Sequence, residues 1–273
     1  MSQDPSEAQN LQKSLDQLAQ WEKEMSVAEK DAEIYRIKRT QQSYATRRDI
    51  LKSVKMFWYI VLAENDDFAE YVNVEDLKYL ESIENLYVYY PVADSDDTSG
   101  DNYKDFSITI TFADSDDSLV PPQEVTKNFR TIVKDGEETI VSDPVDIEWP
   151  EELQSINPIL IKKENKGKEL TKDQKKNYRL GMKSFFSWFA WTGEKSGKEF
   201  RSGEDLTRLI VDDLFLNALK YYVLALPNED EDDQSDEEDS SEGEELDLSE
   251  EEDVDTGKRS GEDEIEQEPK RRK

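Results

Sequence analysis

The feature that most constrains this chain is a long segment without helix-breaking residues. No Pro or Gly occurs between Ser6 and Pro91. Apolar residues recur every three or four positions over residues 9–63, with charged and polar residues between them, as on one face of a helix. We expect a dimerisation helix over residues 9–65, and residues 9–63 as one helix would be about 80 Å long. One small domain cannot cover such a narrow, long apolar stripe, so the pattern favours pairing with a second copy.

The face expected to meet the second copy is formed by residues at helical spacing. They are Leu15, Leu18, Trp21, Met25, Ala28, Ala32 and Tyr35. The alternative is two separate helices with a break near Thr40–Ser43, where the polar run RTQQS interrupts the stripe. Periodicity alone leaves both arrangements open.

Charge divides the chain into two parts. The 273 residues carry a net charge of −31, and residues 229–273 contain 23 acidic and six basic residues but no aromatic one. All five Trp, twelve Tyr and ten Phe precede this segment. Since a segment of this composition cannot bury enough apolar surface to offset its ordering entropy, we expect residues 227–273 to be disordered, together with the polar residues 1–8. A folded domain is expected over residues 66–226.

That domain is expected to be α+β. Residues 66–72 and 74–83 are typical of short helices, and residues 86–90, 106–112, 125–134 and 139–149 of strands, joined as an antiparallel sheet. Asp135-Gly136 is a strong hairpin signal. Thr171 and Gln174 form a capping box for a helix that would carry the aromatic cluster Phe185–Trp191. A further helix is expected over residues 206–222, and strands followed by helices favour helices covering one face of the sheet.

Composition also excludes classes of function. The chain has no Cys and no His, which excludes disulfides, thiolate or imidazole metal sites and the common nucleophilic triads. WTGEKSGKEF lacks the Gly and Ser/Thr of a phosphate-binding loop, and the repeated ADSDD lacks the Gly of a calcium loop. We therefore expect no enzyme activity, no cofactor and no metal. No membrane span or signal peptide is evident, so we expect a soluble intracellular protein.

The acidic C-terminal segment carries two short signals. Ser235, Ser241 and Ser249 each have Glu three residues later, the context that acidophilic kinases prefer; the alternative is that they stay unmodified. The basic cluster Lys270, Arg271, Arg272 and Lys273 is typical of a nuclear import signal, which would bind an import receptor, although such a cluster also arises by chance. The overall acidity argues against direct nucleic-acid binding and for a basic partner.

Several stretches together resemble the SET-like branch of the nucleosome assembly protein family. They are EVTKNFRTIVKDGEETIVSDPVDIEWP, SINP, KKNYRLGMKSFFSWFAWTGEKSGKEF and DDLFLNALKYY, within a likeness that covers roughly residues 9–226. The resemblance implies a homodimer formed through the long N-terminal helix, with two α+β "earmuff" domains beneath it. It also implies a histone chaperone that binds H3–H4 and the H2-type histone pair on its acidic underside and promotes nucleosome assembly in the nucleus.

The resemblance carries over to particular residues. Asp212 and Asp213 match an acidic pair that contacts histones or an acetyltransferase, and Glu204 and Asp205 are further candidates for histone binding. Lys175 and Lys176 match a basic pair expected to face a histone H3 acetyltransferase, which the chain would stimulate. Many relatives have Pro in the stretch matching DDLFLNALKYY, and this chain has none. The alternatives are a dedicated acetyltransferase activator and a phosphatase inhibitor, with histone binding incidental in both.

Overall fold

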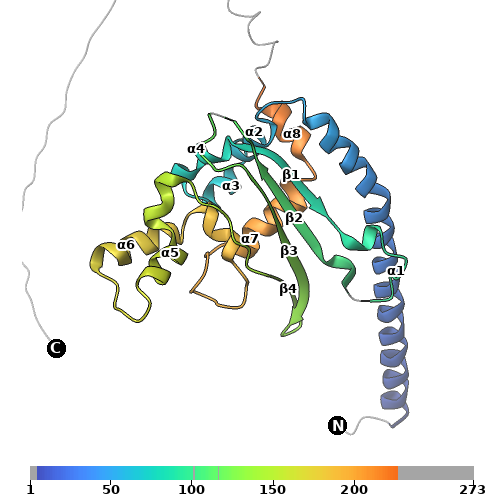
Figure 1. Ribbon diagram of the computed structural model, residues 1–273. Coiled ribbons are helices and arrows are strands. Elements are labelled where there is room, and N and C mark those ends of the chain that lie inside the picture. Colours follow the sequence, from blue (N-terminus) through green and yellow to red (C-terminus); the bar gives the residue numbers. More distant parts are fainter. Residues whose placement is uncertain (1–4, 101, 116, 227–273) are drawn as a thin grey trace, which may run out of the picture. The chain divides into compact units, whose positions relative to one another are not determined.

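The computed structural model describes residues 5–100, 102–115 and 117–226 (Figure 1). The expectations for the acidic C-terminal segment, its serines and its basic cluster therefore lie outside the described residues. Helix α1 spans Pro5–Leu51 as one helix of 47 residues, without the alternative break near Thr40–Ser43. Its N-terminal half extends beyond the rest of the domain, and its C-terminal half runs beside strand β1 (Figure 1).

The first helix ends at Leu51 and not, as the sequence predicted, at residue 65. After Leu51 the chain turns, and Met56 adopts a left-handed conformation with φ of 57°. Helix α2, Phe57–Ala63, then starts in a new direction. Phe57, Trp58, Val61 and Leu62 are buried in the domain core. Because no Gly or Pro marks this turn, the helix break follows from tertiary packing rather than from local propensity.

Four strands form one antiparallel sheet in the order β1-β2-β3-β4. Their bounds are Ile83–Tyr89, Phe106–Phe112, Gln123–Lys134 and Glu137–Ser142. The expected hairpin joins β3 to β4, and Asp135 and Gly136 have φ of 54° and 88°, as a type I′ turn requires. The last strand stops at Ser142, well before residue 149, because Pro144 follows and offers no backbone donor.

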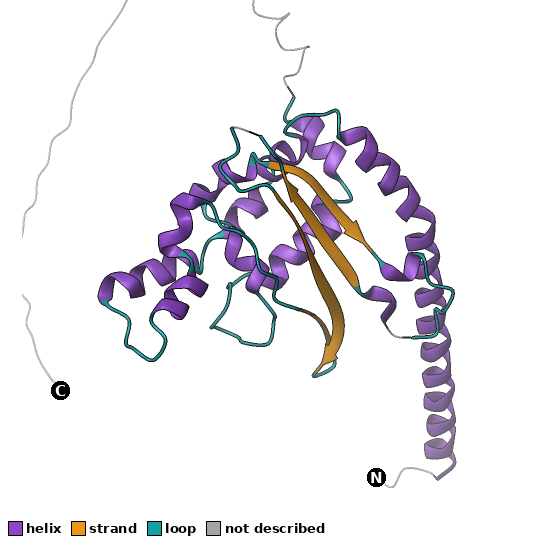
Figure 2. Ribbon diagram, viewed as in Figure 1, coloured by secondary structure: helices purple, strands orange, loops and turns teal. Residues whose placement is uncertain are grey.

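The remaining helices are short, and most lie on one face of the sheet (Figure 2). The α-helices are α3 (Asp66–Tyr71), α4 (Leu77–Leu80), α5 (Pro158–Glu164), α6 (Lys172–Gly181), α7 (Gly203–Arg208) and α8 (Ala218–Leu224). The 3₁₀ helices are η1 (Val74–Asp76), η2 (Pro91–Ala93), η3 (Asn102–Lys104), η4 (Glu151–Ile156) and η5 (Phe185–Ala190). A π-helical segment, η6, spans Leu209–Leu214. The α+β fold with a long N-terminal helix is therefore confirmed.

Two expectations about the later helices have different outcomes. The capping box is present, since the Thr171 hydroxyl accepts from the Gln174 amide and the Gln174 side chain accepts from the Thr171 amide. The helix it starts, however, ends at Gly181 and does not carry the aromatic cluster. Phe185–Ala190 forms the separate helix η5, whose N-cap Ser184 accepts from the Phe186 amide at 3.3 Å.

The core lies between the sheet and η5. Trp188 is fully buried and packs against Phe129 of β3, with the ring centres 5.7 Å apart and the rings tilted by 30°. Its indole nitrogen donates to the Thr207 hydroxyl of α7 at 3.0 Å. The core also holds the charged side chain of Lys127, whose ammonium donates to the carbonyls of Asp143, Phe189 and Trp191 at 2.7–2.9 Å. These contacts fix α7, and with it the π-helical segment, against the sheet.

Candidate functional site

An acidic hollow lies where α1, the sheet and the π-helical segment meet. It has a volume of about 430 Å³, and α1 contributes Glu29 and Glu33 to its wall. The rest of the wall is formed by Tyr90, Tyr103, Lys104, Phe106, Thr131, Glu138, Ile140, Arg208, Val211 and Asp212. These residues come from segments far apart in the sequence, so the hollow exists only in the folded chain.

The cations of the hollow are already paired. The Lys104 ammonium lies 2.6 and 2.7 Å from the two carboxylate oxygens of Glu138, and Arg208 donates to Glu204 at 2.8 Å. Arg36, on the next turn of α1, pairs with Glu33 at 2.7 Å. The carboxylates of Glu29 and Asp212 form no ion pair or hydrogen bond with the described residues. The hollow therefore offers unpaired negative charge.

The pKa values of Glu33 and Asp212 are shifted in opposite directions. The hydrogen bond from Arg36 lowers the pKa of Glu33. Burial raises the pKa of Asp212, although the charges of Arg208 and Arg36 oppose this effect. A partly desolvated carboxylate without a partner is the group that a cation entering the hollow stabilises most. Asp212 is thus the strongest single candidate for contact with a basic ligand.

The π-helical segment separates the two neighbouring aspartates. The Phe215 amide donates to the Ile210 carbonyl at 2.9 Å, a bond that spans five residues. Asp212 lines the hollow, whereas the Asp213 carboxylate accepts from the Tyr221 hydroxyl at 2.6 Å and from the side-chain amide of Asn217 at 2.7 Å. Asp213 therefore has a hydrogen-bond partner on α8, whereas the carboxylate of Asp212 has none among the described residues.

Glu204 and Asp205, the second predicted acidic pair, also have different surroundings. Glu204 accepts from the Thr139 hydroxyl at 2.8 Å and the Ile140 amide at 3.2 Å, besides its ion pair with Arg208. These bonds tie α7 to β4 and outweigh the effect of burial, so the pKa of Glu204 is lowered. Asp205 is exposed and lines a different recess, beside Tyr71 and Arg201. Of the four predicted acidic residues, only Asp212 lines the hollow.

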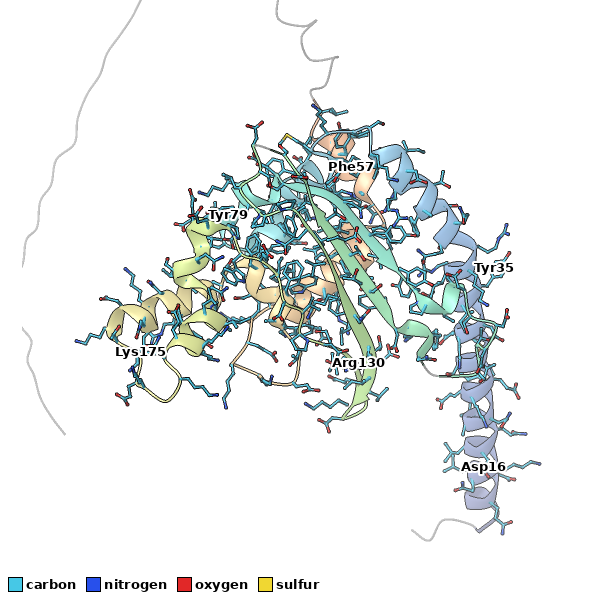
Figure 3. The ribbon with its side chains drawn as sticks, in the orientation of Figure 1. Asp16, Tyr35, Phe57, Tyr79, Arg130 and Lys175 are labelled. Atoms are coloured by element: carbon cyan, nitrogen blue, oxygen red, sulfur yellow. The ribbon has the colours of Figure 1, made fainter. Side chains whose placement is uncertain are left out.

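The other predicted sites lie elsewhere on the domain. Lys175 and Lys176 are exposed on α6, and Figure 3 places Lys175 on the side away from α1. On α1 the predicted dimer face is open to solvent, with Leu15, Leu18, Trp21, Met25 and Tyr35 between 41 and 67% exposed. Ile34 and Ile37, in contrast, are buried against Val92 of η2. No described helix combines the length and the apolar character that crossing a membrane requires.

Sequence reasoning missed most of the hollow. Glu29, Glu33 and Glu138 look like ordinary solvated charges in the sequence, and only the fold, which brings them together around one hollow, distinguishes them. The residues of α1 that pack against the domain were also missed, because Ile34 and Ile37 lie outside the predicted stripe. Their apolar character was the signal that could have found them.

Comparisons with known proteins agree with this architecture. Residues 6–259 match the nucleosome assembly protein (NAP) family. The chain is 36% identical to vacuolar protein sorting-associated protein 75 of Saccharomyces cerevisiae over 226 residues, 80% of this chain and 81% of that protein. It is 32% identical to a putative nucleosome assembly protein of Schizosaccharomyces pombe over 225 residues, 78% of this chain and 79% of that protein.

Solved structures give the same result. The crystal structure of the Vps75 histone chaperone matches with a TM-score of 0.67 and 36% identity, covering 78% of this chain and 98% of that one. The crystal structure of Ccp1 matches with a TM-score of 0.56 and 30% identity, covering 80% and 99%. Sequence, fold and the long leading helix thus agree, and the chain belongs to the nucleosome assembly protein family.

Proposed function

We propose that this chain is a histone chaperone that binds H3–H4 and the H2-type histone pair in the acidic hollow and promotes nucleosome assembly in the nucleus. The observation that carries the proposal is the unequal pairing of charge in the hollow. Lys104 and Arg208 have carboxylate partners, whereas Glu29 and Asp212 have none among the described residues. A basic histone segment supplies the missing cations, as DNA phosphates cannot.

The proposal includes a homodimer formed through α1. Five large apolar side chains on one face of the helix are open to solvent, and the N-terminal half of α1 extends beyond the domain. Covering them with the same face of a second helix removes this apolar surface from water. Two copies of the hollow on one rigid dimer then present a larger acidic surface than one chain alone.

Charge reversal tests the role of the hollow. We expect Glu29→Lys with Asp212→Lys to weaken the binding of H3–H4 by about tenfold or more at about 0.15 M salt, since two uncompensated carboxylates become like charges. The matched control is Glu164→Lys with Glu169→Lys, two exposed acids on the α5–α6 side. Fluorescence titration of labelled histones measures both. Equal weakening by the two double variants would mean that only net charge matters, and would contradict binding in the hollow.

A second function, stimulation of a histone H3 acetyltransferase, is supported by Lys175 and Lys176. Both are exposed on α6, on the side away from α1, so an enzyme could meet them while the hollow holds histones. Lys175→Glu with Lys176→Glu should reduce stimulation of the acetyltransferase and leave histone affinity unchanged. If charge reversal at Glu29 and Asp212 reduced stimulation but not histone affinity, the chain would instead be a dedicated activator.

Inhibition of a phosphatase is the remaining alternative function. A phosphatase assay with the pure protein tests it.

A further inference from the structure

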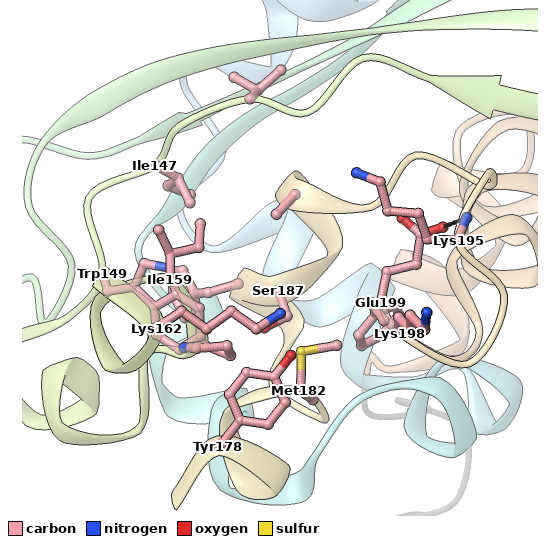
Figure 4. A pocket seen from close by; sticks show the side chains of 15 residues that line it. Ile147, Trp149, Ile159, Lys162, Tyr178, Met182, Ser187, Lys195, Lys198 and Glu199 are labelled. Carbon is pink, nitrogen blue, oxygen red and sulfur yellow. Dashed lines mark hydrogen bonds between the residues drawn. The ribbon is translucent and has the colours of Figure 1, made fainter. Parts of the chain in front are cut away.

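A second cavity opens between the segment that follows β4, helices α5 and α6, and the loop after η5 (Figure 4). Its volume is about 240 Å³, below the roughly 300–1,000 Å³ of typical small-molecule sites. The lining is largely apolar and includes Ile147, Trp149, Ile159, Met182, Phe186 and Phe200. Ile159 remains 47% exposed. The cavity therefore has the size and the surface to receive apolar side chains rather than a cofactor.

Three lysines from two separate segments also line this cavity. Lys162 belongs to α5, and Lys195 and Lys198 belong to the loop after η5 (Figure 4). All three are exposed, and none of their ammonium groups forms an ion pair with a described residue. The Lys162 ammonium lies 4.9 Å from the centre of the Tyr178 ring, which holds it beside the cavity. The mouth thus carries uncompensated positive charge.

The acidic side chain in the lining, Glu199, feels the charge of Lys195 but forms no ion pair with any of the three lysines. Glu199 accepts from the backbone amides of Thr192 and Lys195, both at 2.7 Å, and from the Thr192 hydroxyl at 2.9 Å. Its carboxylate therefore stabilises the loop itself. The neighbouring sequence adds to the positive field, since residues 162–183 contain nine Lys and Arg against three Asp and Glu in a chain of net charge −31. An anionic ligand is the electrostatic complement of this surface.

We propose that this cavity binds a peptide segment of a second protein in which a large apolar side chain is flanked by carboxylates. The apolar side chain enters between Ile159 and Met182, and the flanking carboxylates pair with Lys162, Lys195 and Lys198. A nucleic acid satisfies the lysines but leaves the apolar lining exposed to water, so a peptide fits both halves of the site. This surface is separate from the acidic hollow and serves an acidic partner rather than a basic one.

The test uses the full chain and a fluorescein-labelled peptide, Glu-Asp-Glu-Leu-Asp-Leu-Glu-Asp-Glu, followed by anisotropy at about 0.15 M salt. We expect saturable binding that weakens about tenfold with Lys195→Glu and Lys198→Glu together, because two pairs at the mouth become repulsive. The matched control is Lys166→Glu with Lys168→Glu, two exposed lysines that do not line the cavity. A peptide with both Leu replaced by Ser should bind about tenfold more weakly to the unaltered chain.

A second variant keeps the test independent of net charge. Ile159→Ser changes a half-exposed side chain, so the fold is retained, and it should abolish the preference for the Leu peptide over the Ser peptide. Equal weakening by the two lysine double variants, or equal affinity for the two peptides, would overturn the proposal. So would displacement of the peptide by an equal concentration of duplex DNA, or binding that appears only when residues 228–273 are deleted. Histone binding by the acidic hollow is measured separately and is unaffected by these variants.

Discussion

Asp212 and Asp213 are adjacent in the chain, yet their carboxylates serve different parts of the molecule. Asp212 lines the acidic hollow without a partner among the described residues, while Asp213 accepts from Tyr221 of α8 at 2.6 Å. The five-residue hydrogen bond from Phe215 to Ile210 belongs to the π-helical segment that contains both residues. π-helical turns of this kind occur often at functional sites.

This division predicts opposite effects for two equivalent substitutions. Asp212→Asn should weaken histone binding several-fold and leave the free energy of unfolding nearly unchanged, because the side chain has no internal partner. Asp213→Asn should lower the free energy of unfolding by about 1 kcal/mol, since the bond from Tyr221 to a charged acceptor is weakened, with little effect on histone affinity. Urea unfolding and histone titration of both variants measure the two effects. Loss of stability in Asp212→Asn together with loss of histone affinity in Asp213→Asn would contradict these separate roles.

Charge placed on the open face of α1 should prevent dimerisation. Leu18→Glu with Met25→Glu buries a carboxylate pair from each copy in the proposed interface and should weaken the dimer by about two orders of magnitude or more. Lys23→Glu with Ser26→Glu changes other faces of the same helix turns and serves as the control. Sedimentation velocity distinguishes monomer from dimer. A dimer that persists in the first variant would mean that copies associate through another surface.

Deleting residues 229–273 should weaken histone affinity without changing stoichiometry. The deleted residues carry a net charge of −17, which should strengthen long-range attraction to a basic partner, whereas in the proposal the hollow supplies the defined contacts. We expect an affinity loss of about tenfold at about 0.15 M salt that shrinks as salt is raised, because the Debye length falls. Titration at several salt concentrations measures both quantities. An isolated peptide of residues 229–273 that reproduced the affinity and stoichiometry of the full chain would contradict a folded binding site.

The buried Lys127 predicts a pH dependence of stability. Burial lowers the pKa of Lys127 to about 7, against an ordinary value of 10.5. Between these values the unfolded chain binds one more proton than the folded chain, so this residue's contribution to stability rises with pH from about 7 to about 10, by up to about 1.4 kcal/mol per pH unit. Lys127→Met removes this dependence and the Lys127 donor of three carbonyls, of which those of Phe189 and Trp191 keep a second donor, the Val145 amide and the Ser142 hydroxyl, so we expect stability to fall by about 1 kcal/mol near pH 7.

Urea unfolding of the unaltered chain and Lys127→Met at pH 7, 8 and 9 tests this. Since all other titrating groups are shared, the difference between the two free energies of unfolding isolates Lys127. The account requires that difference to grow as pH rises. A difference that stays constant would show that the three carbonyls keep the ammonium charged over this range.

The sequence was most informative where local rules act alone. The strict alternation of residues 106–112 predicted β2 with its bounds, and Asp135-Gly136 predicted the turn between β3 and β4. Thr171 and Gln174 predicted the start of α6. In each case the backbone conformation follows from a few neighbouring residues, so no distant contact was needed to identify it.

The sequence did not predict features of the fold that depend on packing between residues far apart in the chain. The end of α1 at Leu51 has no Gly or Pro signal and depends on burial of Phe57 and Trp58 in the core. The aromatic run Phe185–Ala190 forms a 3₁₀ helix because Trp188 must meet both Phe129 and Thr207. The acidic hollow combines residues from α1, β4 and the π-helical segment, so a family resemblance located Asp212 but not Glu29 or Glu33.

Site-specific crosslinking tests the central claim most directly. Tyr103 lines the acidic hollow and Tyr178 lines the second cavity, so each is replaced in turn by the photoreactive analogue p-benzoylphenylalanine. With H3–H4 bound at about 0.15 M salt, the account predicts a histone crosslink from position 103 and none from position 178. A crosslink of equal yield from both positions, or from position 178 alone, would contradict histone binding in the acidic hollow.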